Sequence, residues 1–146
     1  AGVTWVDDSK ATNAHSTQAA LSSVRPGSAV WIVGGDTKGA DLHELVARVR
    51  PYLRGAVVIG ADPTPVLQAL EDEAPDLPRR VVPAASAREV IEEAVRQASA
   101  MAQEGDTVLL APAAASWDQF TSYAERGDMF AQAARAQAGV DQDRQP

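Results

Sequence analysis

The stretch DDSKATN, residues 7–13, carries side chains suited to binding a phosphate or a nucleotide. Lys10 offers a mobile ammonium group, Thr12 a hydroxyl, and Asp8 a carboxylate that can accept a hydrogen bond from a ribose hydroxyl or a metal-bound water. If a helix follows, its positive N-terminal end points at the same place. A structural interpretation is equally open, in which Asp8 and Asn13 cap that helix and Lys10 is a solvated charge.

A second stretch suited to chemistry is GGDTKGAD, residues 34–41, where three glycines surround Lys38. Gly34, Gly35 and Gly39 permit backbone conformations that other residues resist, so the backbone could approach a ligand closely. The spacing does not match the GxxxxGK[ST] pattern, so this stretch is not a Walker A loop. The glycines could equally serve a tight turn at the end of a strand.

The third stretch is APAAASWDQF, residues 111–120, with Tyr123 shortly after it. Ser116 and Gln119 match a capping-box pattern, which predicts the start of a helix. Trp117 and Tyr123 would lie near the start of that helix, where aromatic side chains belong to the core more often than to a binding wall. Read alone, this stretch predicts structure rather than chemistry.

Short apolar, β-branched runs recur along the chain and are typical of buried strands, and stretches with helical periodicity lie between them. The helix that begins at Ser86 has the clearest start, because Ser86 and Glu89 form a capping-box pattern. The predicted strands are 3–6, 29–33, 56–60, 80–82 and 107–111, and the predicted helices are 15–24, 41–53, 65–73, 86–103 and 117–138, the last with a possible break near Gly127.

This alternation predicts an α/β fold, namely a Rossmann-like, three-layer α/β/α domain with a mostly parallel sheet of about five or six strands. Ligands of such sheets bind beyond the carboxyl ends of the strands. Each of the three stretches follows a strand and precedes a helix, so all three should lie along that one edge of the sheet. We call this edge the rim.

The composition limits the classes of function. A chain of 146 residues suffices for a single domain, and its net charge of −7 argues against a general nucleic-acid surface. No apolar run approaches the roughly 20 residues of a membrane span, and the first residues do not resemble a signal peptide. Cysteine is absent, and the two histidines, His15 and His43, are interpreted as ordinary helix residues, so no metal site is expected. We expect a soluble, cytoplasmic monomer that binds neither nucleic acid nor membrane.

Taken together, the stretches DDSKATNAHST, GGDTKGADL and APAAASWDQFTSYAERGDMFAQ resemble, in order and spacing, the C-terminal domain of the Mur ligases, and most closely the D-glutamate-adding members. The resemblance covers about Val3 to Ala136, and DSKATN with a later SxDQFxxxxxRGxxF is a far stronger signal than any lone glycine loop. It implies that 1–138 form an amino-acid-binding domain. The segment 139–146 has no apolar pattern after Gly139, which predicts a disordered tail. The resemblance also implies that the chain is a fragment of a longer protein, in which a UDP-binding domain and a central ATPase domain come first.

The resemblance implies a role for each candidate residue. Asp8 would contact the ribose region of ATP, Lys10 the phosphates and the reacting acyl phosphate, and Thr12 the nucleotide or the incoming D-glutamate. Lys38 would bind one D-glutamate carboxylate. The other end of the amino acid would be held by Ser116, the backbone of Trp117 and the region of Tyr123. Trp117 and Tyr123 stand where the resemblance leads us to expect an aliphatic residue and a phenylalanine.

The implied reaction belongs to peptidoglycan biosynthesis. ATP, with Mg²⁺ bound mainly by the central domain, would phosphorylate the carboxylate of UDP-N-acetylmuramoyl-L-alanine, and the D-glutamate amine would attack the acyl phosphate. Because this chain has no P-loop, it should be inactive alone. Three alternatives stay open: a stand-alone module that binds glutamate or a nucleotide, the C-terminal domain of a sibling Mur ligase, and that of a folylpolyglutamate synthase.

Overall fold

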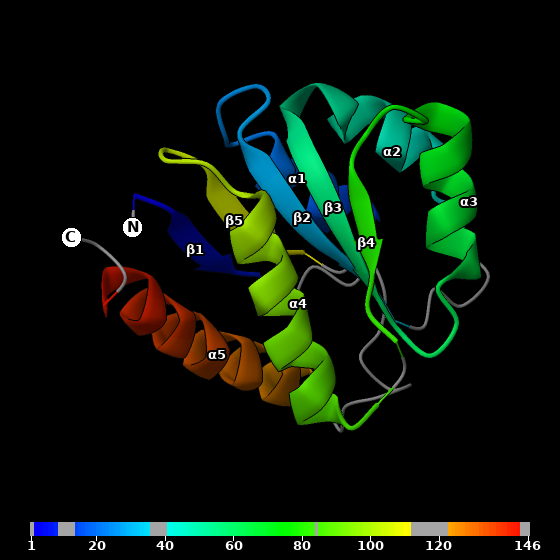
Figure 1. The fold of residues 1–146 in the computed structure, drawn as a ribbon. Coiled ribbons are helices and arrows are strands. Elements are labelled where there is room, and N and C mark those ends of the chain that lie inside the picture. The colour runs from blue at the N-terminus through cyan, green and yellow to red at the C-terminus, as the bar shows by residue number, and fades with distance from the viewer. Residues whose placement is uncertain (1, 9–13, 36–40, 84, 112–122, 144–146) are drawn as a thin grey trace.

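The fold is a parallel sheet between two layers of helices (Figure 1). The computed structural model describes residues 2–8, 14–35, 41–83, 85–111 and 123–143. The five strands lie in the order β1-β5-β2-β3-β4, and each pair of neighbours is parallel. The elements are β1 (Thr4–Asp7), α1 (Ala14–Leu21), β2 (Ala29–Gly34), α2 (His43–Val49), the 3₁₀ turn η1 (Arg50–Tyr52), β3 (Leu53–Ile59), α3 (Thr64–Glu73), β4 (Arg79–Val81), α4 (Ala87–Met101), β5 (Thr107–Leu110) and α5 (Tyr123–Asp143).

The predicted three-layer α/β architecture is confirmed, and each predicted strand is present. The second predicted helix ends early, at Val49, because Pro51 lies in the 3₁₀ turn that follows, and β3 then begins at Leu53. The predicted break near Gly127 is wrong, since α5 runs through this residue. The same helix continues to Asp143, so the first part of the segment 139–146 is helical rather than disordered, while 144–146 lie outside the described residues.

Each face of the sheet has its own apolar core because successive side chains of a strand point to opposite faces. In β2, Trp31 and Val33 pack with α1, α2 and α3, whereas Val30 and Ile32 pack with α4 and α5. All six residues of β2 are buried, which explains why the strand is a continuous apolar run in the sequence. Within the described residues, no helix is both long and apolar enough to cross a bilayer.

The predicted cap of α4 is confirmed. The Ser86 hydroxyl oxygen accepts a hydrogen bond from the backbone N–H of Glu89 at 3.3 Å, and the hydroxyl itself donates to the Glu89 carboxylate at 3.0 Å. One side of the helix is fully apolar and buried against the sheet. The cap therefore fixes where the helix starts, and the buried side fixes how it lies on β2 and β3.

Candidate functional site

The three candidate segments leave the sheet from three neighbouring strands. Segment 9–13 follows β1, segment 112–122 follows β5, and segment 36–40 follows β2, and these strands are adjacent in the order β1-β5-β2. The backbone N–H of Asp8 donates to the Leu110 carbonyl at 2.8 Å, and that of Ala111 donates to the Ile32 carbonyl at 3.3 Å. The described residues that flank the segments thus place all three starting points on the rim, as the sequence predicts.

The end of β1 is packed against the start of α5. A Cβ atom added to Gly127 would lie 2.6 Å from Oδ2 of Asp7, so only a glycine allows this closeness without displacing the carboxylate. Three residues further on, Phe130 packs against Trp5 of β1, with ring centroids 6.1 Å apart. The RGxxF part of the motif therefore fixes α5 against the strand that leads into segment 9–13.

Arg126, beside that glycine, was not singled out by the sequence reasoning. Its side chain is completely buried, which is rare for a charged residue. The neighbouring Gly127 contacts Asp7, so this buried guanidinium belongs to the rim end of α5. The available signal was its position in the motif, directly before the glycine. Its burial could not be predicted, because a buried arginine requires partners that the tertiary structure supplies.

The start of segment 112–122 is held from the core. The indole N–H of Trp31, a fully buried residue of β2, donates to the backbone carbonyl of Ala111 at 2.7 Å. A buried Trp usually places its N–H on such an acceptor. The link joins the centre of the sheet to the rim across 80 positions of sequence, so no local pattern indicates it.

The glycines at the end of β2 have a structural explanation. Gly34 has a φ of +129°, and a Cβ there would collide with the carbonyl oxygen of Ile59 on β3. Gly35 follows with a φ of +134°, which also favours glycine. Of the two interpretations left open by the sequence, the structural one accounts for this pair, and Gly39 lies outside the described residues.

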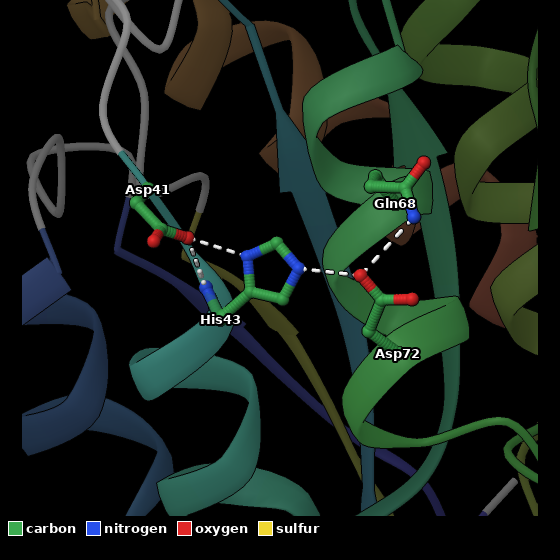
Figure 2. A network of polar contacts seen from close by, with 4 residues as sticks. All are labelled: Asp41, His43, Gln68 and Asp72. Carbon is green, nitrogen blue, oxygen red and sulfur yellow. Dashed lines mark hydrogen bonds and ion pairs between the residues drawn. The ribbon is translucent and has the colours of Figure 1, made fainter.

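A network of polar contacts begins directly after segment 36–40 (Figure 2). Asp41 accepts hydrogen bonds from the backbone N–H of His43 at 2.9 Å and contacts its ring Nδ1 at 2.5 Å. The ring Nε2 lies 2.7 Å from Oδ2 of Asp72 on α3, which also accepts from Gln68 at 3.1 Å. The hydrogen bond to Asp72, followed by that to Asp41, raises the pKa of His43 above its ordinary value.

Most of the predicted site residues fall in parts of the chain that the structure leaves undescribed. Asp8 is described and lies half-buried at the end of β1. Tyr123 is the first residue of α5, and only its backbone placement is described. Outside the described residues lie Lys10, Thr12, Lys38, Ser116 and Trp117. In the described part of the chain, no group of three or more His, Cys, Asp or Glu side chains could hold a metal ion.

Comparison with known proteins identifies the family of this chain. The family model described as "Mur ligase, glutamate ligase domain" matches residues 1–114. The chain therefore belongs to the Mur ligase family, as the sequence resemblance indicates.

Three relatives make the similarity more specific, and each is named UDP-N-acetylmuramoylalanine--D-glutamate ligase. The protein from Leifsonia xyli is 52% identical over 98% of this chain, that from Thermobifida fusca 52% over 94%, and that from Streptomyces coelicolor 51% over 92%. The matched part makes up 27%, 29% and 28% of these relatives, respectively, so the chain spans less than a third of their length.

Proposed function

We propose that this chain is the amino-acid-binding domain of a longer, cytoplasmic ligase that joins D-glutamate to UDP-N-acetylmuramoyl-L-alanine in peptidoglycan biosynthesis. The observation that carries the proposal is the position of the three candidate segments, which start side by side on β1, β5 and β2. The relatives named for this ligation match more than nine-tenths of the chain, which supports the same substrates.

The distribution of positive charge also supports a binding role for the rim. The chain has two lysines, and both Lys10 and Lys38 lie in segments that leave the rim. All its other cationic side chains apart from histidine are arginines. In a chain with a net charge of −7, an anionic substrate has to be held by local cations, and these two lysines follow β1 and β2 in the sequence.

The proposed reaction has two steps. The γ-phosphoryl group of ATP is transferred to the carboxylate of UDP-N-acetylmuramoyl-L-alanine, which gives ADP and an acyl phosphate. The amine nitrogen of D-glutamate then forms a bond to the acyl carbon, phosphate leaves, and the amine loses a proton. Charge develops on the phosphoryl and acyl oxygens in both steps, so cations and backbone donors at the rim would stabilise the transition states.

In this proposal the site residues divide into two groups. Asp8, Lys10 and Thr12 face the nucleotide, with Lys10 also at the acyl phosphate. The Asp8 carboxylate is suited to a ribose hydroxyl, and Mg²⁺ would arrive with the ATP phosphates and be held mainly by other domains of the ligase. The D-glutamate substrate has a carboxylate at each end. Its contacts would be Thr12, Lys38, Ser116, the backbone of Trp117 and the region of Tyr123.

The test is phosphate release by the longer ligase that contains this chain, supplied with ATP, Mg²⁺ and UDP-N-acetylmuramoyl-L-alanine. Release should require D-glutamate and should not occur with L-glutamate or a diamino acid. Release that requires a diamino acid would instead identify a sibling ligase, and a folded enzyme that releases no phosphate with any amino acid would overturn the proposal. The 146-residue chain alone should release none.

Two lysine variants assign the roles. Lys38→Ala should raise the KM for D-glutamate about ten- to hundredfold, as expected for loss of a charged hydrogen bond, with little change in the KM for ATP. Lys10→Ala should instead lower kcat by about a hundredfold or more, because its partner develops charge in the transition state. Arg135→Ala, at an exposed position on α5, removes one positive charge away from the rim and is the matched control. An unchanged KM for D-glutamate in Lys38→Ala would remove Lys38 from its role. An unchanged kcat in Lys10→Ala would remove Lys10 from its role.

A further inference from the structure

His43 connects the residue that follows segment 36–40 to a neighbouring helix (Figure 2). Its ring contacts a carboxylate at each nitrogen, with Asp41 at 2.5 Å from Nδ1 and Asp72 at 2.7 Å from Nε2. A neutral imidazole carries a single N–H and can donate to only one of them. The geometry therefore fits the imidazolium form, in which both nitrogens donate.

The charges of the three groups support one another. The pKa of His43 is raised by its hydrogen bonds to Asp72 and Asp41. The pKa of Asp41 is lowered, first by the backbone N–H of His43, and that of Asp72 is lowered, first by the His43 ring and then by Gln68. The arrangement is thus an anion-cation-anion bridge that is complete when the histidine is charged and both carboxyls are ionised.

Both ends of the bridge are attached to buried parts of the fold. Asp72 lies on α3, which is anchored in the core by Val66, Ala69 and Leu70. On the other side, Asp41 accepts from the first backbone N–H of α2, a helix with its own buried side. The described contact between α2 and α3 therefore determines where the chain emerges from segment 36–40.

We propose that His43 is a positioning residue, which as an imidazolium holds Asp41 against α3 and thereby fixes the described residue that directly follows segment 36–40. The inference rests on the proposed function, because it predicts that the binding of D-glutamate through Lys38 depends on the charge of His43. Lys38 precedes Asp41 by only three positions in the sequence, which is why we expect the position of Asp41 to affect D-glutamate binding.

Other charged groups surround the bridge. From α1, His15 lines a shallow hollow together with Asp41, and Glu44 and Arg48 of α2 line the same hollow and pair with each other. The η1 turn places Arg50 at the opposite end of α2 from His43. His15 is therefore the matched control, because it is a second histidine near Asp41 that does not form the bridge.

The sign of the pH dependence follows from the directions of the shifts. Because the pKa of His43 is raised in the folded chain, the bridge is complete below the ordinary histidine value of about 6.5 and is lost as the pH rises through the raised value. Because the pKa values of Asp41 and Asp72 are lowered, both carboxylates stay charged even somewhat below the ordinary aspartate value, and acid opens the bridge only there. Positioning should therefore weaken at alkaline pH.

The first experiment is a proton NMR titration of the two histidine rings in the 146-residue chain, which needs no substrate. The His43 ring should titrate above the ordinary histidine value, and the backbone amide of Asp41 should shift in step with it. Asp72→Asn should lower the pKa of His43, and His15→Gln should leave it unchanged. A His43 ring that titrates at or below the ordinary value would overturn the bridge.

The second experiment measures the KM for D-glutamate against pH in the longer ligase. The KM should rise as His43 loses its proton. His43→Gln should raise the KM at low pH by about three- to fivefold, as expected for an exposed charged link, and should remove this step, while kcat and the KM for ATP change little. Asp72→Asn should move the step to lower pH, and His15→Gln should leave it in place.

The outcomes separate the two proposals. A D-glutamate-dependent ligase whose KM profile is the same in the parent and in His43→Gln would overturn the positioning role and keep the proposed function. A ligase that does not respond to D-glutamate would overturn the proposed function and with it the predicted link to substrate binding. The titration in the isolated chain would then still decide whether the bridge exists.

Discussion

The two edges of the sheet use charged residues in different ways. At the edge where the strands begin, which we call the floor, Asp106 is completely buried and pairs with Arg54 of β3 through both of its carboxylate oxygens. The same carboxylate accepts from the backbone N–H of Gln103 at 2.8 Å. Nearby, Arg25 donates to the carbonyl of Gly105 at 3.3 Å. These floor contacts join charged groups to partners within the domain.

At the rim, the carboxylates stand where segments leave the strands. Asp7 lies against Gly127, Asp8 is half-buried at the start of segment 9–13, and Asp41 follows segment 36–40. The two lysines lie in these same segments. The comparison teaches that a charged residue in this fold has to be judged by its edge: the floor charges pair within the domain, whereas the rim charges include the residues that the proposed function assigns to substrate binding.

The largest effect is expected at the floor. Asp106→Ala should lower the free energy of unfolding by about 3 kcal/mol, at the low end for a broken buried pair, because the Arg54 side chain is 33% exposed and can turn to water. Denaturant unfolding of the chain measures this, and Asp106→Asn should recover part of the loss by keeping the acceptor for Gln103. If Asp106→Ala instead left stability unchanged and altered only catalysis in the longer ligase, the charged residues of the floor would have the same role as those proposed for the rim.

The sequence predicts the elements and the layers better than it predicts which strands are neighbours. Strands buried on both faces, such as β2 and β3, appear as continuous apolar runs, and Ser86 marks the start of α4. The position of β5 between β1 and β2 leaves no such local mark, because it depends on how distant strands pair. Gly127 suggested a break in α5, yet its real role is a close contact with Asp7, which only the tertiary structure supplies.

In the candidate site, too, local features can be predicted from the sequence and long-range contacts cannot. The sequence predicts that three segments leave one edge, because each follows a strand, and the described flanking residues confirm their common edge. It does not predict the links that hold these flanks, since Trp31 lies 80 positions from Ala111 and His43 lies 29 positions from Asp72. The sequence interpretation of His43 as an ordinary residue of an amphipathic helix missed its bridge to α3 for that reason.

A smaller effect on stability is expected at the rim, with Gly127→Ala. Alanine favours a helix interior over glycine by about 1 kcal/mol, but the added Cβ would lie 2.6 Å from the Asp7 carboxylate and must displace it. We expect a net loss of about 1 kcal/mol in the free energy of unfolding and a larger proportional loss of turnover in the longer ligase. The measurement pairs denaturant unfolding with phosphate release for the same variant.

A double variant, Asp7→Ala with Gly127→Ala, separates the effect of the contact with Asp7 from the effect of helix propensity. In an Asp7→Ala background the clash is removed, so adding Gly127→Ala should increase stability by about 1 kcal/mol through helix propensity alone. If Gly127→Ala already stabilises the parent chain by that amount, the Asp7 carboxylate moves aside freely, and the glycine is not needed for the approach of α5 to β1.

The smallest effect is expected at Ser86, which lies at the same edge as the rim but beside β4, at the far side of the sheet from β1. Ser86→Ala removes the acceptor for the Glu89 backbone N–H at an exposed helix start, so it should lower the free energy of unfolding by about 0.5 kcal/mol, at the low end for a lost cap. Ser86→Asp should restore the cap and the stability. Because β4 carries none of the three segments, both variants should leave the KM for D-glutamate of the longer ligase unchanged. A raised KM for D-glutamate in Ser86→Ala would mean that the functional rim extends beyond β1, β5 and β2 to α4. The whole edge of the sheet would then define the site, and not only its three adjacent strands.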